Sequence, residues 1–181
     1  MSSRRLLIGT ATAAAAAALA AVFSVAGPAQ PALAVETAPA APAGGLSTLQ
    51  EFKTPGGGWF YTLNGTEATN ATAKFKFTKS ADLGKLYASQ QPGTVAIHRL
   101  KAKSPQPSYM LSISPSEISS PNFTDEGVLG YADSAQKPGA VHLTRFSNHG
   151  KWRALPERPT EVNNMKAAGY TVDGQLGWIQ P

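Results

Sequence analysis

The stretch FTKSADLGKLYASQQPGTVAIHRL, residues 77–100, decides the fold because the chain repeats it as FTDEGVLGYADSAQKPGAVHLTRF at residues 123–146. The two stretches align at an offset of 46 without a gap and share nine identical residues. A third, partial copy begins at Tyr170, and the segment that it lacks at the end of the chain stands at residues 49–52. We therefore predict three units of about 45 residues each.

Each predicted unit opens on a turn and an alternating strand. Pro92-Gly93 and Pro138-Gly139 combine a residue with fixed φ and one that accepts positive φ, so both pairs predict turns. The residues that follow alternate between apolar and polar, as expected for half-buried strands. An aromatic segment comes next, and a Thr/Ser-Glu step then ends the shared pattern.

The helical part differs from unit to unit. In the third unit Thr160 predicts an N-cap and Gly169 predicts the helix end. The second unit allows barely one turn before Pro121, and the Thr/Asn/Ala mixture at residues 66–73 of the first is a poor helix. After the helix, residues 170–178 predict two short strands around an Asp173-Gly174 turn.

One unit of this size buries too little apolar surface to fold alone, so the three must share a core. We predict a mainly β domain that is closed, pseudo-threefold and β-trefoil-like, with short helical segments. A three-bladed, propeller-like arrangement is the alternative.

The first 45 residues have a different composition from the rest. Residues 1–34 predict a signal peptide, with Arg4 and Arg5, an apolar run over residues 6–26 and Ala-Leu-Ala at 32–34. Residues 35–45 predict a flexible Ala/Pro/Gly tail, and residues 46–181 the three-repeat domain. We expect a secreted, wall-associated protein that meets the membrane only through its leader before cleavage. The Sec and twin-arginine routes both remain open.

Charge and composition exclude several functions. The chain has 16 Lys and Arg residues against 11 Asp and Glu residues, and the net charge falls from +5 to +3 without Arg4 and Arg5. Cysteine is absent, which excludes disulfides, thiol nucleophiles and Cys-rich zinc sites. No motif indicates nucleic-acid binding or a cofactor.

Four segments carry a resemblance to a known family. EGVLGY (126–131), DGQLGW (173–178), WFYT (59–62) and AAGY (167–170) resemble a repeat of unknown function found in secreted bacterial proteins. That repeat has the patterns Pro-Leu-Tyr-Arg, His-Phe-Tyr-Thr and Glu-Gly-x-x-Gly-Tyr, and the resemblance covers about residues 46–181. Trp59 stands where the pattern has His. The resemblance implies an accessory or binding module of wall-associated proteins and secreted hydrolases.

Polar residues that recur once per unit predict structure rather than catalysis. Glu67, Glu117 and Glu161 predict caps at helix starts or in turns, and Arg99 and Arg145 are expected to pair with such carboxylates or with backbone carbonyls. His98, His142 and His149 are not at ligand spacing, so we expect no metal site. Without a catalytic motif we expect no enzyme, and a small hydrolase would need two carboxylates, or a histidine and a carboxylate, in one cleft.

Aromatic side chains are the remaining candidates for binding. Most of them are expected to fill the core, with Trp59 and Trp152 as exceptions. The candidate ligand-binding residues are Trp59, Tyr61, Tyr109, Trp152, Arg99 and Arg145. We expect a secreted, non-catalytic module for a glycan or cell-wall polymer. The alternative is an extracellular protein-interaction or inhibitor module.

Overall fold

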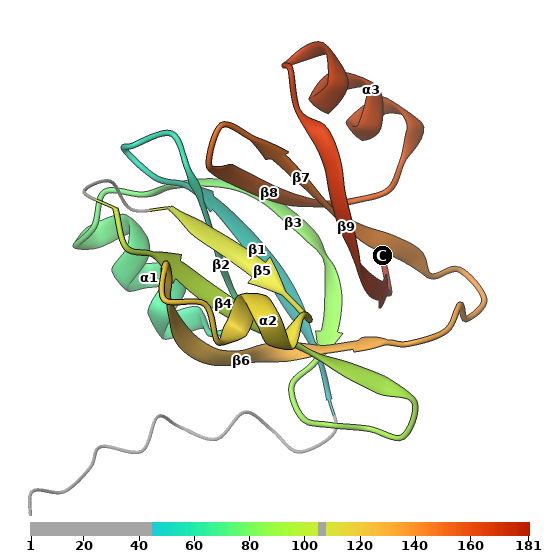
Figure 1. The fold of residues 1–181 in the computed structure, drawn as a ribbon. Coiled ribbons are helices and arrows are strands. Elements are labelled where there is room, and N and C mark those ends of the chain that lie inside the picture. The colour runs from blue at the N-terminus through green and yellow to red at the C-terminus, as the bar shows by residue number, and fades with distance from the viewer. Residues whose placement is uncertain (1–44, 105–107) are drawn as a thin grey trace, which may run out of the picture. The chain divides into compact units, whose positions relative to one another are not determined.

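The structure is a computed structural model that describes residues 45–104 and 108–181. The predicted signal peptide and nearly all of the tail lie outside these residues. Strand, strand, helix and strand follow one another three times along the chain, as Figure 1 shows. The elements are β1 (Leu46–Lys53), β2 (Trp59–Thr62), α1 (Gly65–Ala73), β3 (Thr78–Tyr87), β4 (Thr94–Ala102), β5 (Tyr109–Ser112), α2 (Pro115–Ile118), β6 (Phe123–Asp133), β7 (Val141–Asn148), β8 (Lys151–Pro156), α3 (Pro159–Ala167) and β9 (Thr171–Ile179).

The strands pair in the same way in each set. β1 is antiparallel to β2 and β3, β4 to β5 and β6, and β7 to β8 and β9. The sheet runs in the order β2-β1-β3-β6-β9-β7-β8, and β4 joins it by pairing with β6 and β5. The mainly β prediction is confirmed. None of the described helices is both long and apolar enough to cross a membrane.

The sheet is open, so the predicted closed, trefoil-like sheet needs correction. The three sets are joined by single residue pairs, Tyr87 with Tyr131 and Asp133 with Trp178. An isolated bridge between Lys85 and Gln180 adds a contact from the chain end back to β3. Because the long strands meet at points and do not run side by side, they form no continuous closed ladder.

Glycine is required where these long strands approach one another. A Cβ on Gly84, whose φ is +140°, would lie 2.5 Å from the Gln180 carbonyl oxygen. A Cβ on Gly177, whose φ is +111°, would lie 2.7 Å from the Ala132 Cβ. The repeated Leu-Gly step of the sequence therefore marks the places where one set of strands touches the next.

Replacing Gly84 by Ala is expected to lower the free energy of unfolding by about 2–3 kcal/mol, because both the backbone conformation and the contact with Gln180 are lost. Gly93→Ala is the matched control, since Gly93 also has positive φ, +74°, but has open space around it. Urea unfolding measures both. Equal losses would show that the close approach contributes nothing.

The helices depart from prediction in two places. α1 is a full helix because the Asn64 side chain accepts hydrogen bonds from the amides of Thr66 and Glu67, at 2.8 and 3.1 Å. The predicted Thr160 N-cap of α3 is wrong: the helix begins at Pro159, with Arg158 in the cap position. The short α2 is confirmed, and Gly169, with φ of +79°, directly follows the C-cap of α3.

The predicted hairpin around Asp173-Gly174 is also wrong. β9 runs unbroken through both residues, and Gly174 pairs with Arg145 of β7 next to a register shift. The Asp173 carboxylate accepts a hydrogen bond from Nε of Arg145 at 2.7 Å. This ion pair engages the Asp173 side chain, which could otherwise have supported a tight turn.

Apolar side chains form two clusters. The larger contains Leu49, Ile97 and Leu143 from β1, β4 and β7. The smaller lies where α1 meets β1, β2 and β5, and consists of Phe52, Phe60, Ala68, Ala71, Phe77 and Tyr109. Alanines on the inner face of α1 allow the helix to approach the aromatic rings. The smaller cluster forms the base of the candidate site.

Candidate functional site

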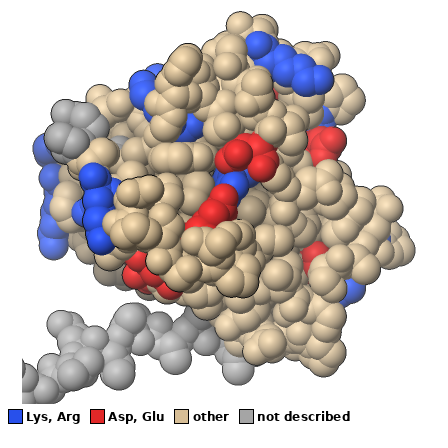
Figure 2. Space-filling view, viewed as in Figure 1, with Lys and Arg blue, Asp and Glu red and all other residues tan. Residues whose placement is uncertain are grey.

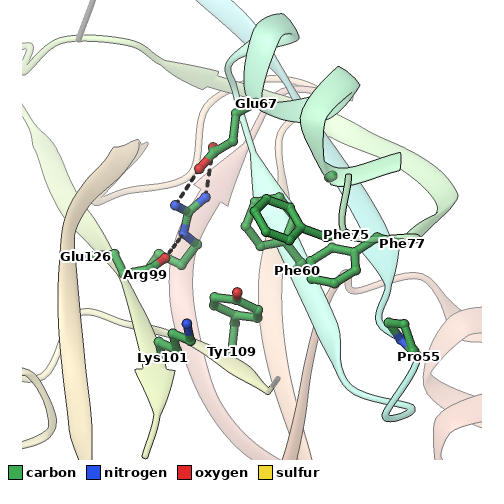
Figure 3. Close-up of a pocket in the computed structure, with 10 residues that line it drawn as sticks. Pro55, Phe60, Glu67, Phe75, Phe77, Arg99, Lys101, Tyr109 and Glu126 are labelled. Atoms are coloured by element: carbon green, nitrogen blue, oxygen red, sulfur yellow. Dashed lines mark hydrogen bonds and ion pairs between the residues drawn. The ribbon is translucent and has the colours of Figure 1, made fainter. Parts of the chain in front are cut away.

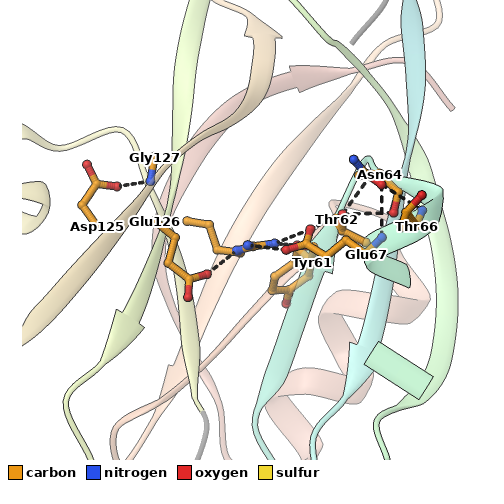
Figure 4. Close-up of polar contacts among 9 residues, drawn as sticks. Tyr61, Thr62, Asn64, Thr66, Glu67, Asp125, Glu126 and Gly127 are labelled. Atoms are coloured by element: carbon orange, nitrogen blue, oxygen red, sulfur yellow. Dashed lines mark hydrogen bonds and ion pairs between the residues drawn. The ribbon is translucent and has the colours of Figure 1, made fainter. Parts of the chain in front are cut away.

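Arg99 on β4 joins two sets of strands. Its guanidinium donates to the Tyr61 carbonyl at 2.7 Å and to both carboxylate oxygens of Glu67 at 2.7 and 2.9 Å. Nε donates to Glu126 on β6 at 2.7 Å. Figure 4 shows Glu67 beside Thr62 and Asn64, and Glu126 on the other side of the site. The predicted pairing of Arg99 with a recurring glutamate is confirmed.

Arg145 on β7 repeats this arrangement one set later. It donates to the Leu111 carbonyl at 2.8 Å, to Glu117 at 2.7 and 2.8 Å, and through Nε to Asp173. Its pairing with Glu117 is confirmed as well. In both places a hydroxyl of the preceding strand donates to the same glutamate, from Thr62 to Glu67 at 2.5 Å and from Ser112 to Glu117.

These contacts hold both glutamates in the ionised form. Burial alone would raise the pKa of Glu67, but hydrogen bonds from Arg99 and Thr62 and the Arg99 charge lower the pKa overall. Hydrogen bonding from Arg145 is the main cause that lowers the pKa of Glu117. The nearby carboxylates outweigh the effect of burial on Arg99 and raise its pKa.

Acidification is expected to destabilise the fold through these two carboxylates. The folded-state pKa values of Glu67 and Glu117 lie below the ordinary value of 4.5, so their stabilisation is present above that pH and is lost as pH falls below it. Urea unfolding at pH 7 and pH ~3.5 measures the loss. The Glu117→Gln variant should lose less stability between the two pH values. An unchanged pH dependence in this variant would contradict the assignment.

A third ion pair lies at the corresponding position of β1, but there the strand carries the acid and its partner the base. Glu51 on β1 stands where β4 and β7 carry Arg99 and Arg145, and it is fully buried. Arg153 on β8 donates to both Glu51 oxygens, at 2.9 and 2.8 Å. The third recurring glutamate, Glu161, does not take part, since it pairs with Arg158 at 3.3 Å.

A cleft opens beside Arg99, above the smaller apolar cluster, and we call it the Arg99 cleft. It has a volume of about 380 Å³. Its aromatic lining comes from Phe60, Phe75, Phe77 and Tyr109. Its charged lining comes from Glu67, Arg99, Lys101 and Glu126. Figure 3 shows phenyl rings on one side of the guanidinium and the two carboxylates bound to it.

The aromatic walls of the Arg99 cleft are packed against each other. Phe60 meets Tyr109 at 5.0 Å and Phe77 at 5.4 Å between ring centroids, both edge to face. The Arg99 guanidinium carbon lies 4.6 Å from the Phe60 centroid. Phe75 stands at the rim with 61% of its surface exposed, so a flat ring is free to contact a ligand.

The structure divides the predicted binding residues among four places. Arg99 and Tyr109 meet in the Arg99 cleft, although Tyr109 is only 7% exposed, and Arg145 lies in its own ion cluster. Trp152 packs edge to face on Phe123, 5.4 Å away between centroids, and lines a separate groove.

Trp59 and Tyr61 belong to the Glu51–Arg153 pair. The Arg153 guanidinium lies over the Trp59 ring, 3.8 Å from its centroid. Tyr61 is 1% exposed, and its hydroxyl accepts a hydrogen bond from the Ala154 amide at 2.7 Å. Burial, followed by the Glu51 charge, raises the pKa of Tyr61.

Sequence reasoning missed Phe75 as a candidate residue. The pattern that could have identified it is the pair Phe75 and Phe77, two positions apart and directly after α1. The composition did not predict that helix. The histidines are dispersed: His98 contacts Asp125 at 3.0 Å, and His142 stacks on Trp178. Within residues 45–104 and 108–181, no three His, Cys, Asp or Glu side chains are grouped to hold a metal ion.

Fold and site together define a small, mainly β domain with an aromatic cleft built around a paired arginine. The chain belongs to the DUF5648 family, a domain of unknown function whose family model matches residues 47–180. This agrees with the resemblance to a family of unknown function. Comparisons with curated proteins and with solved structures gave no significant match.

Proposed function

We propose that this protein is a secreted, non-catalytic binding module that takes a sugar unit of a glycan or cell-wall polymer in the Arg99 cleft. One observation carries the proposal: aromatic faces and fixed polar groups converge in a single concave site. Ligand sites commonly have volumes of roughly 300–1,000 Å³, mostly apolar walls and a few placed polar groups. The Arg99 cleft has these properties.

The chemistry of a sugar ring fits this lining. A pyranose has C–H groups on its faces, which pack on aromatic rings, and hydroxyls around its edge, which need hydrogen-bond partners. Phe75 offers an exposed face, while Glu67, Glu126 and Lys101 offer acceptors and a donor. Because Arg99 already holds both carboxylates in place, these side chains lose little conformational entropy when a ligand binds.

The arrangement in three pseudo-threefold repeats belongs to this proposal. Support comes from the three strand-strand-helix-strand sets and from the matching contacts of Arg99 and Arg145. The sites would not be equivalent, because α2 has four residues and α1 has nine. Export through the 1–34 leader and association with the cell wall are also part of the proposal.

One observation supports a hydrolytic function, and two observations oppose it. Two carboxylates, Glu67 and Glu126, do meet in the Arg99 cleft. However, a general acid needs a raised pKa, and the pKa of Glu67 is lowered. Both carboxylates are also bound to the same guanidinium, and binding without turnover is therefore the better-supported function.

An extracellular protein-interaction or inhibitor module is the second candidate. The burial of Tyr61 and Tyr109 favours it, because it leaves fewer exposed rings for sugars than the sequence suggested. The surface charge does not favour a protein ligand over a glycan. Figure 2 shows acidic and basic groups separated by uncharged surface, with blue and red atoms in contact near the centre.

The Phe75→Ala variant tests the proposal, with soluble oligosaccharides released from bacterial cell wall as the probe. We expect it to weaken binding by about tenfold, roughly 1.4 kcal/mol, because the exposed ring face is lost. Val172→Ala is the matched control, since Val172 is 56% exposed but lies on β9. Isothermal titration calorimetry measures both. Equal affinities for the two variants, or no binding by folded wild-type protein, would contradict the assignment.

A further inference from the structure

We propose that the groove where the three strand hairpins meet is a second binding site, and that its ligand is an anionic sugar chain carrying phosphate or carboxylate groups. This hairpin groove, of about 680 Å³, lies between the β1–β2 loop, the facing ends of β4 and β5, and the β7–β8 turn. It shares no lining residue with the Arg99 cleft, so the inference stands independently of the proposed function.

Positive charge in the hairpin groove is unopposed. The charge comes from Lys103 and Lys151, which line the groove, and no Asp or Glu stands among the lining residues of the described chain. Neither lysine forms an ion pair with a described residue, in contrast to Lys79, which pairs with Asp82 at 2.9 Å. Two unpaired ammonium groups in one concavity favour an anionic ligand.

A buried hydroxyl in the hairpin groove lacks a partner. Ser108 is 8% exposed, and its Oγ makes no hydrogen bond with any residue that the structure describes. Buried polar side chains nearly always have a hydrogen-bond partner, and an oxygen of a bound ligand would supply one here. Asn122 is held nearby, because its carbonyl accepts a hydrogen bond from the Lys103 amide at 3.0 Å.

An apolar wall lies beside these polar groups. Trp152 is fixed against Phe123 at an interplanar angle of 69° and is only partly buried. Gly56 and Gly58 on the β1–β2 loop carry no side chain to fill the hairpin groove. An aromatic wall next to ammonium and hydroxyl groups suits a sugar ring with an acidic substituent, which needs one apolar and one anionic contact.

The test uses the whole protein and four oligomers of similar length: galacturonate, glycerol phosphate, neutral glucan and single-stranded DNA. We expect the wild type to bind one or both acidic oligomers more tightly than neutral glucan and DNA, with affinity falling as salt rises. The carboxylate and phosphate oligomers identify which anion is bound. Lys103→Gln/Lys151→Gln should weaken that binding by about tenfold. Lys85→Gln/Lys166→Gln, which removes the same charge outside both sites, should stay within about twofold.

The Ser108→Ala variant tests the contribution of the buried hydroxyl to binding separately from that of the lysine charges. It should weaken binding by about threefold without lowering the unfolding midpoint, because no existing hydrogen bond is lost. Three results would each overturn the proposal: glucan binding equal to acidic oligomers, DNA binding at least as tight, or equal affinities of the two double-lysine variants. Loss of binding in Phe75→Ala alone would concern the Arg99 cleft and not this groove.

Discussion

Replacing Glu51 by Gln is expected to lower the free energy of unfolding by about 3–5 kcal/mol, because Arg153 would keep a desolvated charge without its partner. Glu51 is 0% exposed, and it binds Arg153 through two oxygens. The Tyr61 hydroxyl lies 3.5 Å from Oε1 of Glu51. The change therefore disturbs a buried group of three polar side chains. Urea unfolding at pH 7 measures the effect.

A double variant provides the control for Glu51. Glu51→Met/Arg153→Met removes both charges and fills similar volume, so it should recover most of the stability lost in the single variant. A loss below about 1 kcal/mol in Glu51→Gln would contradict the buried pair. A double variant no more stable than the single one would show that the two residues are not coupled.

Replacing Arg145 by Met is expected to cost about 3–4 kcal/mol, since three partners lose their donor together. The Leu111 carbonyl, Glu117 and Asp173 all accept hydrogen bonds from this guanidinium. Two of the partners are carboxylates, which would be left to repel each other. The Arg145 side chain is 7% exposed, so water cannot easily replace it.

The matched control for Arg145 is Arg158→Met. Arg158 forms an ion pair with Glu161 at 3.3 Å, but 45% of its side chain is exposed. Exposed pairs of this kind contribute roughly 0–1 kcal/mol, so the variant should unfold close to the wild type. Similar unfolding free energies for the two variants would contradict the structural role of Arg145.

Local sequence rules predicted the features that depend on neighbours in the chain. The Pro-Gly pairs lie in turns where Gly93 and Gly139 have φ of +74° and +79°. The equivalent positions of Arg99 and Arg145 in the predicted units also indicated that both would bind glutamates, and both do.

Contacts between distant segments could not be predicted in this way. Glu51 and Arg153 lie 102 positions apart. Glu51 also stands where the predicted repeat has arginine, so the sequence pattern did not indicate this pair. Asp173-Gly174 is a strong turn signal, but β9 continues through both residues because Arg145 binds the Asp173 carboxylate. The Arg99 cleft escaped prediction because it needs α1, which depends on the Asn64 cap rather than on helix propensity.

The most direct test of the Arg99 cleft is an NMR titration of the whole protein with wall oligosaccharides. We expect chemical-shift changes to cluster on the side-chain resonances of Phe75, Tyr109 and Arg99, which line the cleft from three segments. The resonances around Arg145, which has the same contacts without being part of the cleft, should stay in place. Shifts confined to other parts of the surface, or no shifts at saturating oligosaccharide, would contradict the account.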